Sequence, residues 1–431
     1  MRSNYPFATS EAMLERALRT IPLGTQTFSK SRTQYPVGAA PLYADSAQGS
    51  RLQDVDGNEF LDFISSLLAI SLGYRDPDVD AAVTDQLEKG ILFSLPHPLE
   101  IEVSERICEM VPCAEMVRFG KNGSDATAGA IRLARAYTRR NHVAVCGYHG
   151  WQDWYIGSTS RDLGVPEAVR ELTHGFGYND LSSLEDLFRA YPDELAAVIL
   201  EPMNVAYPED GFLEGIRELT ENHGTLLVFD ETITGFRFAN GGAQQLFGVV
   251  PDLATFGKGL ANGYPLAALT GRADIMRMLE DVFFSFTMGG ETLSLAAAKA
   301  VLDKLQRDNV VDQLRSQGEK VIRGIQSLVE QHGVGEIISV SGHPSWSFLN
   351  FSGAGEYSVW QVRTLFLQEV FARGILVLGS HNMSFTHSDD DVDMLLRTYD
   401  EVFPILRHAV EDGTLNAQLR CDVLQPLFKV R

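Results

Sequence analysis

Short apolar runs alternate with amphipathic helical patterns from about residue 115 to residue 300, and this alternation constrains the fold most. The runs are Glu115–Gly120, His142–Gly147, Ala196–Glu201, Thr225–Glu231 and Leu266–Thr270, with helical patterns such as Asp125–Arg140, Leu181–Ala190 and Phe212–His223 between them. Strands that alternate with helices predict an α/β fold with a mostly parallel sheet covered on both faces. Ligands bind beyond the carboxyl ends of such strands, so the residues that follow the runs are candidates for a site.

The two ends of the chain follow a different pattern. The segment Arg51–Phe63 carries an Asp-Gly turn signal at Asp56-Gly57, which predicts a hairpin. After about residue 310 a long helical pattern leads into short strands. We therefore expect a smaller α+β domain made of residues 1–75 and 311–431, with a large domain of residues 76–310 inserted between its two parts.

Composition argues against several classes of function. The chain has 431 residues, a formal net charge of −21 and four cysteines, none of them in a CxxC pair. The acidic charge argues against a nucleic-acid partner, and the cysteine spacing indicates neither a metal site nor a redox dithiol. No apolar run reaches the ~18–20 residues that span a membrane, and Met1–Pro6 begins no apolar signal segment, so we expect a cytoplasmic protein. The motifs of P-loop ATPases, Rossmann dehydrogenases, zinc proteases and serine hydrolases are not found.

An acid and an amine stand where one particular cofactor needs them. Asp230 lies at the end of an apolar run, and Lys258 follows Ala254-Thr255-Phe256 between two glycines. Pyridoxal phosphate (PLP) requires a lysine that forms a Schiff base and an acid that keeps the pyridine nitrogen protonated, so that the ring accepts electrons. Burial would lower the pKa of Lys258 and favour its nucleophilic form. A single lysine is usually a surface residue, and its pairing with Asp230 is what favours catalysis here.

Two further segments offer groups for a phosphate and a flat ring. Asn122, Gly123 and Ser124 follow a predicted strand and open a helix, where unpaired N–H groups and the serine hydroxyl can hold a phosphate. Tyr148 follows the next run and can stack on a ring, while His149 is expected to support the site rather than transfer protons. For each segment alone, an ordinary capped loop or a packing aromatic remains an alternative.

Five motifs follow one another along the chain: Asn122-Gly123-Ser124-Asp125-Ala126, Tyr148-His149-Gly150, Glu201-Pro202, Asp230-Glu231-Thr232-Ile233-Thr234-Gly235-Phe236-Arg237 and Lys258. In this order they resemble the signatures of the class III aminotransferases, which are fold type I PLP enzymes, and are most similar to the subgroup that contains glutamate-1-semialdehyde 2,1-aminomutase. The resemblance covers nearly the whole chain. It implies that Asp230 pairs with the pyridine nitrogen, that Lys258 forms the Schiff base and that Tyr148 stacks on the ring.

The resemblance also implies a homodimer with active sites at its interface. Thr232 occupies the position of a family valine that packs on the other face of the ring. Thr287 matches a threonine that reaches the phosphate of the neighbouring subunit. The expected cofactor contacts are Asn122, Gly123, Ser124, Tyr148, His149, Glu201, Asp230, Thr232, Lys258 and Thr287.

Departures from the aminomutase pattern bear on the reaction. Lys30 stands where the aminomutase has an arginine that binds the substrate carboxylate. A lysine ammonium cannot form the two parallel hydrogen bonds that an arginine makes with a carboxylate. The segment Gly379–Ser384 lacks the aminomutase's glutamate, and no arginine lies between residues 375 and 393.

These changes favour an aminotransferase that passes an amino group from a donor to a small carbonyl acceptor in a ping-pong cycle of PLP and pyridoxamine phosphate. Lys30, Trp151 and Asn204 are the substrate candidates, which suit a hydroxylated or sugar-like acceptor. An aminomutase, a racemase and a non-catalytic PLP-fold protein remain alternatives.

Overall fold

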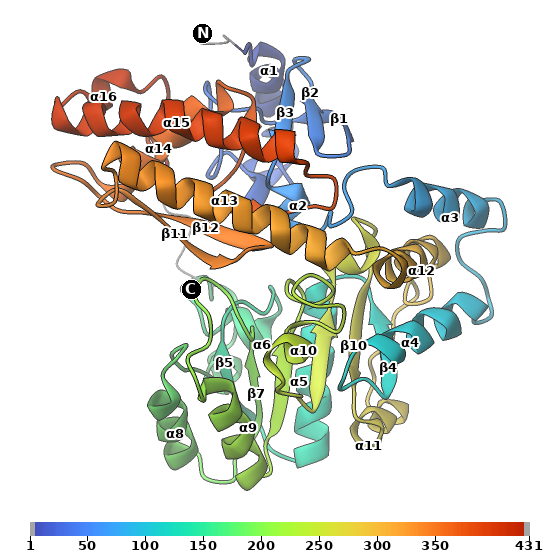
Figure 1. Cartoon of the computed structure of the whole chain (residues 1–431). Coiled ribbons are helices and arrows are strands. Elements are labelled where there is room, and N and C mark those ends of the chain that lie inside the picture. Colours follow the sequence, from blue (N-terminus) through green and yellow to red (C-terminus); the bar gives the residue numbers. More distant parts are fainter. Residues whose placement is uncertain (1–4, 426–431) are drawn as a thin grey trace. The chain divides into compact units, whose positions relative to one another are not determined.

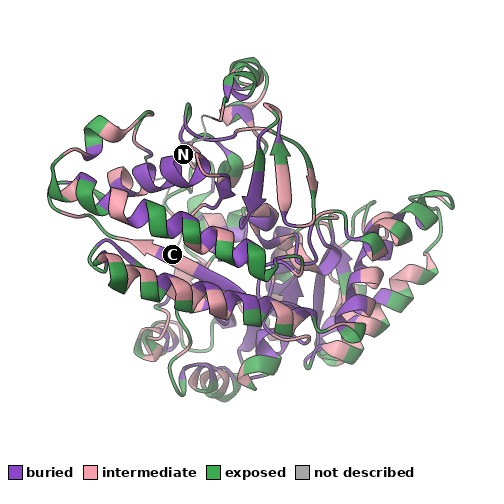
Figure 2. Ribbon diagram, turned by 45° about the horizontal axis from the view of Figure 1, so that its top comes forward, coloured by how far each residue is buried: buried purple, intermediate pink, exposed green. Residues whose placement is uncertain are grey.

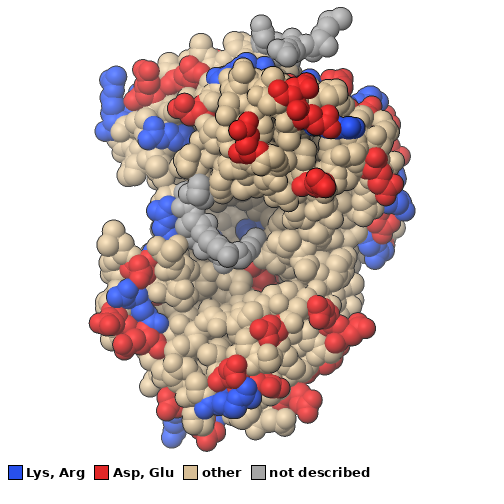
Figure 3. Space-filling view, turned by 90° about the vertical axis from the view of Figure 1, so that its left-hand side faces the viewer, with Lys and Arg blue, Asp and Glu red and all other residues tan. Residues whose placement is uncertain are grey.

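The computed structural model describes residues 5–425, which form two compact units. The small unit consists of residues 5–67, 72–75 and 312–425, and the large unit of residues 68–71 and 76–311. No helix in the described part of the chain is long and apolar enough to cross a membrane. Figure 3 shows acidic side chains scattered over the face that it draws, with basic side chains next to many of them and no extended basic patch.

A seven-stranded sheet forms the centre of the large unit as described (Figure 1). Its strands, in spatial order, are β4 (Met116–Gly120), β10 (Ala267–Gly271), β9 (Leu253–Phe256), β8 (Leu226–Asp230), β7 (Leu195–Leu200), β5 (His142–Cys146) and β6 (Thr173–Gly175). The strands from β9 to β6 are parallel, and β10 runs antiparallel to both of its neighbours. The predicted mostly parallel sheet is therefore confirmed, and the short strands β6 and β9 are additions to the predicted set.

Helices cover both faces of this sheet, as Figure 1 shows. On one face α5 (Gly123–Thr138), α6 (Asp153–Ile156) and α11 (Ala273–Met276) pack against alternate strand residues such as Val228. On the other face α8 (Leu181–Ala190) and α9 (Phe212–Asn222) pack against the intervening residues such as Phe229. Burial on both faces explains why the central strands read as continuous apolar runs in the sequence, and Figure 2 colours these strands as buried. The remaining helices of the large unit are α3 (Pro77–Leu87), α4 (Pro98–Met110), α7 (Glu167–Arg170), α10 (Ala243–Phe247) and α12 (Thr292–Arg307), with the short 3-10 helices η3 (Lys258–Ala261) and η4 (Arg277–Glu280).

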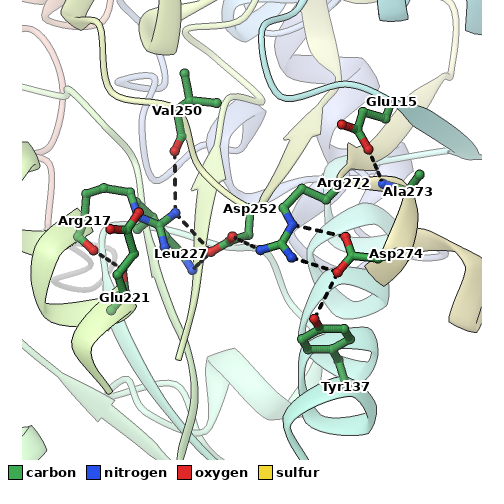
Figure 4. Close-up of polar contacts among 11 residues, drawn as sticks. Glu115, Tyr137, Arg217, Glu221, Leu227, Val250, Asp252, Arg272, Ala273 and Asp274 are labelled. Atoms are coloured by element: carbon green, nitrogen blue, oxygen red, sulfur yellow. Dashed lines mark hydrogen bonds and ion pairs between the residues drawn. The ribbon is translucent and has the colours of Figure 1, made fainter. Parts of the chain in front are cut away.

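An ion-pair network around Asp252 fixes the amino-terminal edge of the sheet (Figure 4). Asp252 directly precedes β9, and its Oδ2 accepts a hydrogen bond from the N–H of Leu227 in β8 at 2.8 Å. Arg217 of α9 lies 3.0 Å from the same oxygen. Arg272, which follows β10, lies 2.9 Å from Oδ1 and also pairs with Asp274. The network thus connects three strands at the edge where β8 and β9 begin and the antiparallel β10 ends. This edge lies opposite to the carboxyl ends of the parallel strands, so the role of the network is structural.

The small unit contains two sheets. One has the order β1 (Ala44–Gln48), β2 (Arg51–Asp54), β3 (Glu59–Asp62) and β13 (Ile375–Leu376), and the other has the order β11 (Ile338–His343), β12 (Trp346–Phe351) and β14 (Ser380–Asn382). Its helices are α1 (Ala8–Ala17), the one-turn segment α2 (Ser65–Leu68), most of α13 (Val310–His332), α14 (Val359–Phe371), α15 (Asp389–Glu411) and α16 (Leu415–Gln418), with η1 (Pro22–Gly24) and η2 (Phe28–Lys30). The predicted hairpin is confirmed, because β2 and β3 pair antiparallel around a turn in which Gly57 has a φ of +83°.

Candidate active site

A cavity of about 410 Å³ opens at the carboxyl ends of the strands in the large unit. Most of the residues singled out from the sequence line it: Asn122, Gly123, Ser124, Tyr148, His149, Trp151, Glu201, Asp230, Thr232 and Lys258. They come from segments that follow β4, β5, β7, β8 and β9, whose carboxyl ends share one edge of the sheet. The parallel arrangement therefore gathers residues that are far apart in the sequence.

Asp230 is a buried carboxylate at the end of β8. Its Oδ2 lies 2.9 Å from Nδ1 of His149, and its Oδ1 accepts hydrogen bonds of 3.1 Å from the N–H of Thr232 and the hydroxyl of Thr255. Burial alone raises the pKa of this carboxyl, but the hydrogen bonds and the attraction to His149, together with the Thr232 contact, outweigh burial and hold the pKa below its ordinary value. Asp230 is therefore ionised at neutral pH and able to hold a proton on a nearby nitrogen base.

His149 is fixed on several sides. Because an ionised carboxylate only accepts hydrogen bonds, Nδ1 of His149 carries the proton that it shares with Asp230. The ring lies parallel to that of Trp154, with 6.4 Å between centroids and 14° between planes, and its edge meets Tyr155. The backbone oxygen of His149 accepts a hydrogen bond from the hydroxyl of Thr127 at 2.8 Å. This packing orients the imidazole toward Asp230, which fits the predicted supporting role.

The amino-terminal end of α5 lines the cavity beside Asp230. The side chain of Asn122 caps the helix by accepting from the N–H of Asp125, so its carbonyl oxygen is already used. Gly123 and Ser124 occupy the first turn, where helix geometry leaves N–H groups without intrahelical partners. Gly150 closes over this turn with a φ of +105°, and a Cβ there would lie 2.2 Å from Oγ of Ser124. Only glycine fits this approach, and the result is a cradle suited to an anion.

Lys258 begins the short helix η3, directly after β9 and Gly257. Its φ of +42° lies in the left-handed region, which non-glycine residues seldom occupy and which costs about 1–2 kcal/mol. Such strain persists where the surrounding structure determines the conformation, and it is common at functional sites. The lysine is half-buried in the wall of the cavity.

Glu201 follows β7 and holds the wall of the cavity that carries Tyr148. Its buried Oε2 accepts hydrogen bonds from the N–H of Tyr148 at 3.0 Å and from Nδ2 of Asn204 at 2.9 Å. A Cβ at Gly147 would lie 2.6 Å from this oxygen, so glycine is required there as well. Glu201 thus positions the segment that carries Tyr148, and Tyr148 and the exposed Trp151 line the cavity.

Three predicted residues lie away from this cavity. Asn204 lines a second cavity of the large unit and touches the first only through Glu201. Thr287 is exposed in the segment between η4 and α12. Lys30 belongs to the small unit and lines a cavity of about 380 Å³ there, with Nζ 3.3 Å from Oγ of Ser66. The predicted roles of Lys30 and Thr287 stay predictions.

Thr255 is a site residue that the sequence analysis did not single out. It lies directly beside Asp230 in the parallel register of β8 and β9, and it is fully buried. The available signal was its position three residues before Lys258 in an apolar run, but the register between two strands cannot be derived from such a pattern. Thr127 of α5 and Tyr155 of α6, which hold the His149 segment, were also not predicted, because their contacts join a helix to a loop and no sequence pattern marks such contacts.

The donor set of the cavity fits the PLP expected from the sequence. An ionised buried carboxylate suits a protonated ring nitrogen, a lysine amine suits an aldehyde, and the start of α5 suits a phosphate. Within residues 5–425, Oγ1 of Thr232 and Nε2 of His149 are buried in this wall without a hydrogen-bond partner. Buried polar atoms of this kind are normally satisfied, so they are consistent with a polar group bound in the cavity.

Comparisons with known proteins agree with this geometry. The family model of aminotransferase class-III matches residues 34–387. The 3-aminobutyryl-CoA aminotransferase of Cloacimonas acidaminovorans is 36% identical over 91% of this chain and 96% of its own length. Glutamate-1-semialdehyde 2,1-aminomutase 2 of Brevibacillus brevis is 35% identical over 93% of this chain and 98% of its own length.

Among solved structures, the FumI protein of Sphingopyxis sp. MTA144 is similar along almost the whole chain. That structure is described as a PLP internal aldimine form. It superposes with a TM-score of 0.88 at 28% identity and covers 96% of this chain and 99% of the FumI chain. The two chains therefore share one fold along almost their whole lengths.

Proposed function

Since the chain belongs to the class-III aminotransferases and is a PLP-dependent enzyme of that family, we propose that it transfers an amino group from an amino donor to a small carbonyl acceptor. The observation that carries this proposal is the buried, ionised Asp230, held by His149 in the same cavity that Lys258 lines. When bound, PLP supplies a carbon that amines attack and a ring that withdraws electrons. In the net reaction the donor gives an amino group and a hydrogen to the acceptor, and it receives the acceptor's carbonyl oxygen in return.

Each residue of the site has a distinct part in the proposal. Asp230 holds the proton on the ring nitrogen, and the Nδ1–H of His149 stabilises the carboxylate in its ionised form. The start of α5 with Gly123 and Ser124 anchors the phosphate. Nζ of Lys258 would hold the cofactor in the absence of a donor amine and, once free, would serve as the base that takes a proton from the donor's amino-bearing carbon. The donor product leaves before the acceptor enters, which is a ping-pong order.

The residues at the mouth of the cavity bear on the acceptor. Tyr148 and Trp151 give the mouth of the cavity an aromatic and hydrogen-bonding character, and both are partly exposed to solvent. Groups of this kind bind hydroxylated carbonyl compounds well, since the rings pack on carbon and the polar atoms meet hydroxyl groups. A hydroxylated or sugar-like acceptor is therefore our proposal.

An intramolecular aminomutase is the second candidate, because two relatives carry that name. The aminomutase has a glutamate in a late segment, and the matching segment of this chain, Gly379–Ser384, has none. His381, in the late segment where the aminomutase has a glutamate, is fully buried and bonds Ser347 at 3.0 Å and Tyr399 at 2.8 Å. Asn382 donates to the backbone oxygen of Ile64. These side chains hold the small unit together, which favours transfer between two molecules.

A second copy of the chain is the proposed protein partner. Large apolar side chains are exposed along α4 and the segments that flank it, among them Leu95 at 77% and Ile101 at 63%. Phe283 is 77% exposed in the segment that also carries Thr287. Residues of α4 and of this segment line a common cavity, so the two segments are neighbours. Several exposed large apolar side chains on neighbouring segments are typical of an interface, and they support the homodimer with Thr287 reaching the partner's phosphate.

The absorbance spectrum of the purified protein tests the proposed reaction. We expect a visible band from the lysine-bound cofactor that falls when L-glutamate or another amino donor is added. Lys258→Ala should lack the band, while Lys89→Ala, which removes an exposed lysine, should keep it. A band that no donor changes, with turnover that starts from the amino form of the cofactor and needs no donor, would establish the aminomutase instead. No band after reconstitution with PLP would refute both.

A further inference from the structure

Tyr155 is a buried residue that contacts the segment carrying Tyr148, and the proposed reaction gives it no part. It belongs to the short helix α6 and is 2% exposed. Its hydroxyl donates a hydrogen bond of 2.8 Å to the backbone oxygen of Gly147. In the described structure Tyr155 does not line the cofactor cavity, so any effect that it has on the cofactor passes through the residues that it holds.

The peptide unit between Gly147 and Tyr148 is held at both of its polar groups. Its oxygen accepts from Tyr155, and its N–H donates to Oε2 of Glu201 at 3.0 Å. A peptide unit is planar, so a partner at the oxygen and another at the N–H together fix the orientation of the plane. The plane contains the Cα of Tyr148, and the clamp therefore restricts the direction in which the side chain of Tyr148 leaves the backbone.

The ring of Tyr155 supports the same segment. It lies perpendicular to the ring of Tyr148, with 5.6 Å between centroids, and it meets the ring of His149 at 5.2 Å and 73°. Aromatic pairs in this edge-to-face arrangement are favourable beyond the area that they bury. Tyr148 is 37% exposed at the cofactor cavity, where a side chain has more than one rotamer open to it. The contact with Tyr155 favours one of these rotamers.

We propose that Tyr155 is a positioning residue of the active site, which holds the Gly147–Tyr148 peptide unit and the ring of Tyr148 in the orientation that stacks on the cofactor. The inference rests on the proposed function, because stacking on PLP is the part that Tyr148 has in it. Glu201 fixes the N–H end of the peptide unit, and Tyr155 fixes the oxygen end and the ring.

A double-mutant cycle on the binding of PLP tests this inference without turnover. Tyr155→Phe removes the hydroxyl and keeps the buried ring, and it should raise the dissociation constant of PLP about fivefold, because a misplaced Tyr148 ring loses part of its stacking. In Tyr148→Ala there is no ring to position. In that background Tyr155→Phe should change the dissociation constant by less than about twofold, which is the scatter of independent sites.

Tyr43→Phe is the matched control. It removes a tyrosine hydroxyl that donates to the backbone oxygen of Gly24 at 2.9 Å in the small unit, and it should leave the dissociation constant of PLP unchanged in both backgrounds. The circular dichroism of the visible band gives a second readout, because it depends on how the cofactor is oriented. The ellipticity per unit of absorbance should change in Tyr155→Phe and stay constant in Tyr43→Phe.

The outcomes separate this inference from the proposed function. A similar rise of the dissociation constant in both backgrounds would give Tyr155 a general structural part and overturn the inference. Wild-type affinity in Tyr155→Phe or in Tyr148→Ala would overturn it as well. In each of these cases a wild-type band that falls with an amino donor leaves the aminotransferase standing. A wild-type band that responds to no amine overturns the proposed function, whatever the cycle on PLP binding gives.

Discussion

Nδ1 of His149 lies 2.9 Å from Oδ2 of Asp230, and both side chains are excluded from solvent. The pair joins the segment after β5 to the end of β8 and keeps a buried carboxylate ionised. An acid in this position without its partner would take up a proton more readily, since burial favours the neutral form. The ionised state on which the proposed chemistry depends is therefore a property of two segments together.

Replacing His149 should raise the pKa of Asp230. In His149→Phe the carboxylate loses its hydrogen bond and the attraction of the imidazole, which leaves burial as the main influence. In the wild-type protein the pKa of Asp230 is lower in the folded chain than in the unfolded chain. Asp230 therefore stabilises the fold at pH values above its unfolded pKa, and this contribution is lost as pH falls through the folded pKa. In the variant the acid limb of the donor half-reaction should therefore begin at a higher pH. The acid-dependent loss of stability that Asp230 contributes should become smaller, because its folded and unfolded pKa values differ less. Profiles of activity and of stability against pH would measure both changes.

His149→Gln provides the matched comparison, because its amide can still donate to Asp230. We expect its pH profile to lie between those of the wild type and His149→Phe. Identical acid limbs in all three proteins would show that His149 does not control the ionisation of Asp230.

Thr255→Val tests whether the Thr255 hydroxyl orients Asp230 for the reaction as well as stabilising the fold. The change removes a buried hydroxyl that donates to Oδ1 of Asp230 and conserves the shape of the side chain. The free energy of unfolding should fall by about 1–2 kcal/mol. Thr270→Val is the control, since its hydroxyl is equally buried and donates to the backbone oxygen of Met116 away from the site. Both variants should lose similar stability in denaturant titrations, and only Thr255→Val should slow the donor half-reaction; equal rates would refute a role in the site.

Gly150→Ala should weaken the binding of PLP. The added Cβ would lie 2.2 Å from Oγ of Ser124, and φ at this position is +105°, so the loop must move away from the start of α5. Gly164→Ala is the control, because its φ of +93° imposes backbone strain while nothing lies within 4 Å of the new Cβ. We expect the dissociation constant of PLP to rise at least ~tenfold in Gly150→Ala alone, as a misplaced anion cradle loses its hydrogen bonds. Equal affinities in both variants would place the phosphate elsewhere.

The sequence predicted which strand end or helix carries each site residue better than it predicted the contacts between neighbouring strands. Asp230, Glu201 and the start of α5 were placed correctly at strand ends, because apolar runs mark where buried strands stop. The three-residue β6 and the four-residue β9 were missed, since strands that short show no periodicity. The contact of Thr255 with Asp230 depends on strand register, which is set by packing of the whole sheet. Asn204 lies in a loop, whose path no periodic pattern describes.

Asp252→Asn should destabilise the large unit without changing the cofactor band. Asp252 is buried at the edge of the sheet where β9 begins, and it pairs with Arg217 and Arg272 (Figure 4). Arg272 is 45% exposed, and the two arginines keep Glu221 and Asp274 as partners, so the loss should be about 1–3 kcal/mol, the cost of breaking buried hydrogen bonds to a charged group. Asp274→Asn removes a half-exposed carboxylate from the same network and should cost only about 0–1 kcal/mol.

Denaturant titration measures both losses of unfolding free energy, and the absorbance spectrum with L-glutamate checks the site. A large loss of the band in Asp252→Asn at a temperature where the protein is folded would show that the two edges of the sheet are coupled, contrary to the structural role given to Asp252.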